Sequence, residues 1–502
     1  MAIFGRREIF TDVEAITSNN VIEILRDAIT THTINKDRCE FLLNYEAGYQ
    51  PLLREKTYRP DINVEDNDNV ANEVTEFKLG FVWGNPITVV QDGDSKKKNI
   101  SKAISMLNKF YNVQGINKKS QELGRYVEIC GIGYTYVEIN TDTNAKAPFR
   151  VEVLDPRYTF VVKSSRYVDH RVMMGVTYRQ DSLGNYYFTC ITNHQRFEVE
   201  NIVKIINGNV EETDDIWRER SRSGEINPLG IVSVIEWERS ADRLGCFERQ
   251  ISEMNALNLA ISDFGNDIDQ NTQAIWHGND IEFPVDEEGN QVNPRSNDWL
   301  LTRTTSEGKT PFVKPLSVNY EYAGMLNFII NKRSLILQKC AVPQRNDNSG
   351  GSTGIAMSDA TGWSSAEASA SKQQAFQEYS KMKELEAVLR AIDVSPFVKE
   401  NDQIRNIDLI DIQPNIKRQK TYELTVKTNA IATLLAKGFA LEDAISIAPL
   451  FADPNVVIER SGEGVKKYQE TEVFKENEQQ SEEKRPFADY SDQIDNSPNI
   501  NG

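Results

Sequence analysis

The sequence predicts an α+β protein of two or more domains, in which long amphipathic helices accompany an antiparallel, β-rich region. Two patterns carry this prediction. Apolar residues recur at spacings of three or four along several long segments, which is typical of helices that bury one face. Between about residues 125 and 240, short β-branched and aromatic runs alternate with turn signals, which is typical of antiparallel strands. At 502 residues the chain is also too long for one compact core.

The first half is expected to contain two helices followed by the β-rich region. The first helix is expected over residues 11 to 45, with Thr11 or Asp12 as its cap. The second should run through Val74 to Phe81 and end at Gly84, in the left-handed conformation, before Pro86; a strand should then begin at Ile87. The strands expected further on are YTYVEI, FRVEVL, RYTFVV, VMMGVTYR, YYFTCIT and IVKII.

The second half contains two amphipathic helices, expected over 246–272 and 319–341, which flank a turn-rich insert with strand-like IEFPV, WLLTR and FVKPL. The elements expected after them are a loop without core-forming residues, a long helix from about Ile355 to Pro396, a strand in IRNIDLIDIQPNI, two short helices over 430–437 and 441–447, and a polar acidic tail from Gly462.

Composition excludes several classes of protein. A formal net charge of −18 argues against a protein that grips nucleic acid over most of its surface, although DNA could still slide past it. Five scattered cysteines and four histidines do not form a zinc pattern, and free thiols in a reducing cytoplasm are expected. The start has no apolar signal region. The longest apolar stretch, Met325 to Val342, is interrupted by Asn331, Lys332 and Arg333, so no membrane span is expected.

Catalytic chemistry is not expected either. The sequence has no phosphate-binding G-x-x-x-x-G-K-[ST] loop, and Gly131-Ile132-Gly133 lacks the third glycine of a dinucleotide motif. Asp408 and Asp411 would lie on opposite faces of their predicted strand, which is unsuitable for holding a metal ion together. His277 has no acid or nucleophile at a meaningful spacing. We therefore expect no catalytic residue, no metal and no cofactor.

The order of these elements resembles that of the portal proteins of SPP1-type siphophages, from about residue 40 to residue 460. EFKLGFVWGNPITV, from Glu76 to Val89, is similar to the passage from helix to strand in that family. VEVLDPRYTFVV is similar to the family's strand-Pro-strand element. The two long helices around a small β insert resemble the stem and clip, and SGGSTGIAM before a long helix resembles the tunnel loop that leads into the kinked helix.

The resemblance implies a subunit of a ring, usually of twelve copies, at one capsid vertex of the virion, assembled in the host cytoplasm. Double-stranded DNA would pass non-specifically along the ring axis. The implied partners are the terminase large subunit on the clip, a head-completion or adaptor protein, and the scaffolding and major capsid proteins. The implied divisions are a wing (1–245), stem helices (246–272 and 319–341), a clip (273–318), a tunnel loop (342–354), a long kinked helix with a wing strand (355–418), crown helices (419–462) and a disordered acidic tail (463–502).

Three sets of residues are candidates for sites in such a ring. The DNA-facing tunnel loop would comprise Gln344, Arg345, Asn346, Asp347, Asn348, Ser349, Gly350, Gly351 and Ser352. The stem residues that could line the channel are Glu253, Asp263, Asp267, Asp269, Lys332, Arg333 and Lys339. The clip residues that could contact partners are Trp276, His277, Phe283, Trp299 and Phe312.

Each set has an alternative explanation. The residues of the proposed tunnel loop could form a disordered surface loop between helices. The acidic stem residues would repel phosphates, but an ordinary helical hairpin with a solvated acidic face has the same pattern. The stem cations could instead pair with carboxylates of an adjacent subunit. The clip aromatics could form the core of a small β module instead of an interface. Two alternative functions also remain open: another virion structural protein, such as a head-tail adaptor or baseplate subunit, and a DNA-processing enzyme.

Overall fold

The computed structural model describes residues 5–52, 63–92, 100–141, 145–166, 168–203, 215–221, 224–272, 276–283, 287–289, 299–305, 308–315, 322–344, 362–399, 402–416, 418, 423–440 and 443–445. Its α-helices are α1 (Val21–Glu46), α2 (Val70–Val82), α3 (Ser101–Val113), α4 (Ile116–Cys130), α5 (Ile251–Thr272), α6 (Tyr322–Lys339), α8 (Trp363–Val394) and α9 (Glu423–Ala436), with short 3₁₀ turns η1 (Glu248–Gln250), η2 (Gln403–Asn406) and η3 (Leu409–Asp411).

The strands form four sheets of mixed size. They are β1 (Ile9–Thr11), β2 (Thr88–Gln91), β3 (Ile132–Ile139), β4 (Phe149–Leu154), β5 (Thr159–Ser164), β6 (Val172–Gln180), β7 (Tyr186–Thr192), β8 (Gln195–Val203), β9 (Asp215–Glu219), β10 (Glu225–Ile226), β11 (Val234–Glu238), β12 (Trp276–Asn279), β13 (Trp299–Thr302), β14 (Phe312–Pro315) and β15 (Ile412–Asn415). The predicted mixture of helix and sheet is confirmed.

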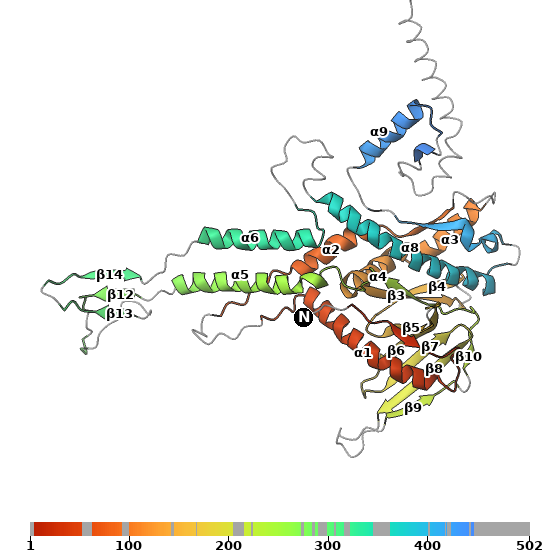
Figure 1. The fold of residues 1–502 in the computed structure, drawn as a ribbon, viewed down its shortest axis with the longest axis horizontal. Helices are drawn as coiled ribbons and strands as arrows, with labels where there is room; N and C mark the ends of the chain where they lie inside the picture. The colour runs from red at the N-terminus through yellow and green to blue at the C-terminus, as the bar shows by residue number, and fades with distance from the viewer. Residues whose placement is uncertain are drawn as a thin grey trace, which may run out of the picture.

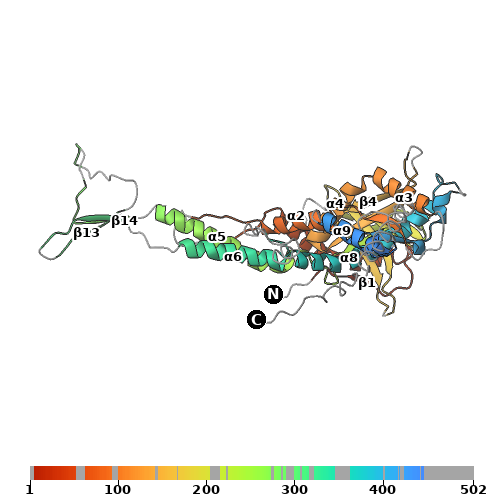
Figure 2. The same cartoon turned by 90° about the horizontal axis from the view of Figure 1, so that it is seen from above.

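The molecule has a broad body from which a helical hairpin projects (Figure 1). α5 and α6 lie side by side in both views, and the small sheet of β12, β13 and β14 lies at the far end of the hairpin (Figures 1 and 2). The body contains a seven-stranded sheet with the path β1-β5-β6-β7-β8-β10 and β9 beside β8, a three-stranded sheet β11-β3-β4, and the β15-β2 pair.

The start of the first helix was predicted too early. α1 begins at Val21, and residues 9–11 form β1, which pairs in parallel with β5 through Ile9 and Val162. Between them, the Asn20 side chain accepts a hydrogen bond from the Thr17 backbone N–H at 2.8 Å. Such local side-chain bonds offer the backbone an alternative to the helix, so α1 starts only after Asn20. Its apolar face then covers one face of the seven-stranded sheet.

The second helix ends where predicted, but for a different reason. Gly84 is not in the left-handed conformation. α2 ends at Val82, and Trp83 follows as its C-cap with a φ of −110°. Trp83 is buried, and its indole N–H donates to Glu128 at 3.1 Å. Its ring also lies so close to Gly124 that a Cβ there would be 2.5 Å from it. Side-chain packing of Trp83 therefore fixes the exit from α2.

Helices α3 and α4 were not predicted. They are joined by Gly115 at a φ of 71°, and α4 ends at Gly131 at a φ of 76°. β3 follows directly at Ile132, as expected for a glycine pair that leads into a strand. The six predicted strands lie in β3 to β8, although residues 204–206 of IVKII are outside the described residues.

Two strand predictions in the second half need correction. In the insert, WHGN forms β12, whereas Ile281 to Phe283 of IEFPV are not in a strand. Most of IRNIDLIDIQPNI is not a strand either, because η2 and η3 precede the short β15. Asp408 and Asp411 consequently belong to one capping turn, in which the Asp408 N–H donates to the Asp411 carboxylate at 3.3 Å.

The remaining C-terminal predictions are partly within the described residues. α8 ends at Val394, two residues before Pro396, and Ser395 between them is extended, as residues before proline prefer. α9 begins at Glu423, earlier than the predicted start at residue 430, and Gly438 follows its end at a φ of 85°. Residues 355–361, most of 441–447 and the predicted acidic tail lie outside the described residues.

Candidate functional site

The helical hairpin is an antiparallel pair held by contacts at both ends. Near the body, Lys339 of α6 forms an ion pair with Glu253 of α5. Further out, the rings of Phe264 and Tyr322 lie 5.9 Å apart. Apolar side chains of both helices, among them Leu257 and Ile336, belong to a core that also includes α1 and α2. The hairpin is therefore anchored in the body at its base and supported by fewer contacts further out.

A buried ionic cluster fixes the base of α5. The Glu248 carboxylate is fully buried and accepts bonds from Arg6 at 2.6 and 2.7 Å, from Arg38 at 2.9 Å and from the Gly245 backbone N–H at 3.0 Å. Arg6 is equally buried, whereas Arg38 is partly exposed. Because charges taken out of water must be paired, this cluster ties the N-terminal segment and α1 to the first turn of the hairpin.

An extended segment, residues 63–69, runs along α5 and is held by side chains of that helix. The backbone N–H groups of Val64, Asp66 and Asp68 donate to side chains of α5 at 2.8 to 3.0 Å. Their acceptors are Asn266, Ser262 and Asn258, respectively. Four helical residues rise about 6 Å and two extended residues about 6.6 Å, so the two repeats match. This segment covers a side of α5 that α6 does not.

Two of the three predicted stem cations form ion pairs within the chain. Arg333 donates from Nε to Asp68 at 2.7 Å and also pairs with Glu73, while Lys339 pairs with Glu253. Lys332 is half-buried. Asp263 and Asp267 also have partners, and they are half-buried, as are Glu253 and Asp269. Pairing within the subunit thus neutralises several charges of the hairpin that were expected to act outside it.

Only the first residue of the predicted tunnel loop is described. Gln344 folds back on α6, accepting a bond from the Ser334 hydroxyl and donating to the Ser334 carbonyl, both at 2.6 Å. Just before it, Ala341 has a φ of 53°, and the buried Lys78 ammonium donates to its carbonyl at 3.3 Å. Burial lowers the pKa of Lys78. Residues 345–352 lie outside the described residues.

The five clip candidates pack largely against one another. Trp299 has Trp276 at 6.0 Å and Phe283 at 4.9 Å between ring centroids, and His277 meets Phe312 at 5.0 Å. All five are half-buried, which favours a role in the core of this sheet. His277 is also bonded to the Thr302 hydroxyl at 2.8 Å.

The exposed apolar residues of the small sheet were not predicted as candidates. They are Leu300, Leu301 and Val313, each 47–48% exposed. The alternating pattern of WLLT and FVKP could have indicated one exposed residue per strand, but the exposure of two consecutive leucines shows that both faces of β13 lack full cover.

Exposed apolar residues also gather on α6, and the sequence pattern missed them. Leu326 and Ile330 are 48% and 54% exposed, and Phe328 and Leu335 are 54% and 52% exposed. At about 100° per residue, the first pair and the second lie about 140–180° apart around the helix. α6 thus has two opposite apolar faces, in addition to the face that meets α5. Exposed apolar side chains gathered in this way are typical of surfaces that contact another molecule.

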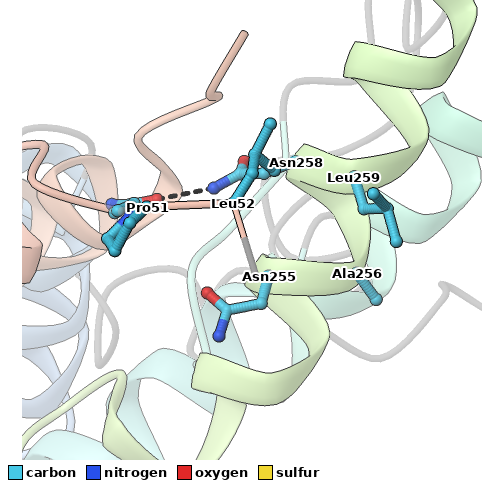
Figure 3. A pocket seen from close by; sticks show the side chains of 7 residues that line it. Pro51, Leu52, Asn255, Ala256, Asn258 and Leu259 are labelled. Atoms are coloured by element: carbon cyan, nitrogen blue, oxygen red, sulfur yellow. Dashed lines mark hydrogen bonds between the residues drawn. The ribbon is translucent and has the colours of Figure 1, made fainter. Parts of the chain in front are cut away.

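A cavity beside the hairpin is lined only by uncharged side chains. Its volume is about 150 Å³, and it lies between residues 50–52 and the first turns of α5 (Figure 3). Its lining consists of amide and aliphatic side chains, namely Gln50, Pro51, Leu52, Asn255, Ala256, Asn258 and Leu259. Within the described ranges, no three His, Cys, Asp or Glu residues gather where they could hold a metal ion.

The cysteines are free thiols, as expected, and four of the five are buried. Burial raises the pKa of Cys246 to about 12 and that of Cys340 to about 11, so both are protonated and unreactive at neutral pH. Across the part of the chain that the structure describes, no helix is long and apolar enough to cross a membrane.

These features are typical of a structural subunit, with a projecting hairpin whose helix α6 exposes apolar side chains in the part of the chain that the structure describes. The family model described as phage portal protein, SPP1 Gp6-like, matches residues 27–484. The chain therefore belongs to the phage portal protein family. A comparison with curated proteins gives no match.

Membership of this family establishes the function at the level of the virion. Portal proteins are structural components of a capsid vertex, take part in DNA packaging and are not catalytic. Forming a ring-shaped DNA channel and docking terminase are general roles of the family. The match extends beyond the resemblance found over residues 40 to 460, and it favours a portal over an adaptor or baseplate subunit.

Proposed function

We propose that copies of this chain form a ring, with α5 and α6 as the stem, the β12–β14 sheet as the clip and the body as the wing. The observation that carries this proposal is the pair of opposite apolar faces on α6. A closed ring with cyclic symmetry needs two different faces on each subunit, one for each neighbour. Leu326 and Ile330 supply one face, and Phe328 and Leu335 supply the other.

The other divisions follow the same plan. Residues 1–245 and the segment 355–418 belong to the wing, 342–354 to the tunnel loop, 419–462 to the crown and 463–502 to an acidic tail. Double-stranded DNA passes along the axis without sequence recognition. We place the terminase large subunit on the clip, where Leu300, Leu301 and Val313 offer apolar contacts. A head-completion protein, the scaffolding protein and the major capsid protein are further partners, and assembly takes place in the host cytoplasm.

Two single substitutions test the lateral faces. Phe328→Asp and Leu326→Asp each place a charge on one face of α6 and should each leave the protein monomeric by mass photometry and sedimentation velocity. Because both side chains are about half exposed in the monomer, near-UV circular dichroism should stay native. Tyr379→Asp is the matched control, since Tyr379 is 68% exposed on α8, outside the hairpin, and that variant should still form rings.

Mixing the two monomeric variants makes the test sharper. Each variant retains the face that the other has lost, so an equimolar mixture should form a heterodimer and no larger assembly. Rings from either variant alone would show that these faces are not the contact between subunits. Rings from the Tyr379→Asp control alone, together with the heterodimer, would support the proposal.

A further inference from the structure

The face of α6 that points away from α5 carries only small and neutral polar side chains. This neutral stripe consists of Ala323, Asn327, Asn331, Ser334 and Gln338. Four of the five are exposed, and Ser334 is half-buried. At about 100° per residue they lie within about 80° of one another, opposite Ile329 and Ile336, which pack in the core shared with α5.

The charges of α6 lie outside this stripe. α6 contains no Asp or Glu, and its cations are Lys332, Arg333 and Lys339. Arg333 and Lys339 are held by carboxylates of the same chain. The stripe itself is therefore uncharged over the whole length of the helix, about 27 Å at 1.5 Å per residue.

The proposed ring limits the directions in which this stripe can point. If neighbours meet at the Leu326 face and the Phe328 face, then α5 and α6 lie at different distances from the ring axis. The stripe then points either toward the axis or toward the outside of the stem.

The largest sheet of the body lies on the α5 side of the hairpin, whereas α9 lies on the α6 side, and we take the side with this sheet to face away from the ring axis (Figure 1). Residues 63–69 and residues 50–52 cover sides of α5 that α6 does not, and the seven-stranded sheet with α1 lies on the same side of the molecule (Figure 1). The space available to one subunit grows with distance from the axis, which favours placing this sheet on the outside. After α6, the chain folds back over the stripe, because Gln344 accepts a hydrogen bond from Ser334.

We propose that this neutral stripe is the surface along which the sugar-phosphate backbone of duplex DNA moves through the stem. This inference rests on the proposed ring. Amide and hydroxyl groups make single hydrogen bonds to phosphate without releasing counterions, so contacts stay weak and independent of salt. Cations repeated around the ring would instead hold the duplex. Glu253, one of the carboxylates expected to line the channel, pairs with Lys339 of α6.

The direction of the stripe can be tested by labelling cysteines in assembled rings. Asn327→Cys and Gln338→Cys should react with a small charged thiol reagent. They should not react with a maleimide carried on a globular protein too large for a channel of duplex width. Leu259→Cys, on the far side of α5, is the matched control and should react with both reagents. In the monomeric Phe328→Asp background, all three positions should react with both.

Labelling of Asn327→Cys in the ring by the large reagent, at the rate found in the monomer, would overturn the inference while leaving the ring intact. Failure of the unsubstituted chain to form rings would instead refute the proposed function, and this inference with it. The two failures are therefore distinguishable by the oligomeric state alone.

Whether the stripe must be uncharged can be tested by introducing lysines into it. The double substitution Asn327→Lys/Asn331→Lys should raise the affinity of purified rings for linear duplex DNA by about tenfold or more at low salt, with a steep loss as salt rises. Asn327→Gln/Asn331→Gln should leave binding weak and insensitive to salt, and Leu259→Lys should resemble it. Equal DNA binding and equal salt dependence in the lysine and glutamine variants would overturn the inference.

Discussion

Replacing Glu248 by Gln should destabilise the protein strongly, because it removes the charge that two arginines share. The carboxylate is fully buried, and the side chain of Arg6 is only 1% exposed. Loss of one partner from a buried ion pair costs about 3–5 kcal/mol, since the other charge stays out of water. Arg38 is 38% exposed and can be hydrated again, so we expect a loss of about 3–4 kcal/mol.

The measurement is the urea midpoint of Glu248→Gln in the monomeric Phe328→Asp background, followed by Trp fluorescence. Asp242→Asn is the control, because Asp242 and Arg249 form an ion pair in which both side chains are more than 60% exposed. That change should cost no more than about 0.5 kcal/mol. Replacing both Arg6 and Glu248 by Met should recover much of the lost stability, as apolar pairs can replace buried ion pairs.

A loss below about 1 kcal/mol for Glu248→Gln, or one no larger than that of the control, would refute this reasoning. It would mean that water reaches Arg6, and that the cluster does not anchor the base of the helical hairpin. Hydrogen exchange offers an independent measurement, since the first turns of α5 should lose protection before the seven-stranded sheet does.

Three further predictions concern other parts of the chain. Burial lowers the pKa of His32 to about 4, so the unfolded chain binds the proton at a higher pH than the folded chain does. The free energy of unfolding should therefore fall by up to about 3 kcal/mol as the pH drops from about 6.5 to 4. In urea titrations at several pH values, His32→Gln should abolish this pH dependence. Hydrogen bonds lower the pKa of Asp280, and the bond from Thr304 has the largest effect. The stabilisation from these bonds is complete above about pH 4 and is lost as the pH falls below it. Asp280→Asn should therefore make the β12–β14 sheet sensitive to proteolysis at neutral pH, as acid should for the unsubstituted chain. Gly265→Ala would place a Cβ 2.9 Å from Val64 and should lower the melting temperature, whereas Gly80→Ala, with nothing within 4 Å, should raise it.

Local patterns predicted the two helices of the hairpin well. The sequence indicated helices over 246–272 and 319–341, and α5 and α6 occupy 251–272 and 322–339. A helix with one apolar face is recognisable from residues three and four apart, without knowledge of what covers that face. The strands between β3 and β8 were predicted for the same reason, since period-two patterns and turn residues are also local.

Elements and contacts that depend on distant partners could not be predicted in this way. β1 exists because β5 lies beside it, more than 150 residues later in the chain, and its three residues carry no distinct pattern. The same holds for the site: Arg333 meets Asp68, and Glu248 meets Arg6, across more than 240 residues. The charge of such a residue is visible in the sequence, but its partner is not.

The apolar residues of α6 illustrate a further limit of sequence patterns. In the proposed ring, they also show why net charge is a poor guide to the surface that faces DNA. A sequence pattern identifies apolar positions but not whether the same chain or a neighbour covers them, so the faces of Leu326 and Phe328 could not be told from core. If both faces contact neighbours, as proposed, the neutral stripe has only two possible directions, toward the ring axis or away from it. The net charge of −18 is an average over the whole chain, whereas α6 contains no acidic residue at all. A surface over which DNA slides therefore need not repel it; it needs only to lack the cations that would hold it.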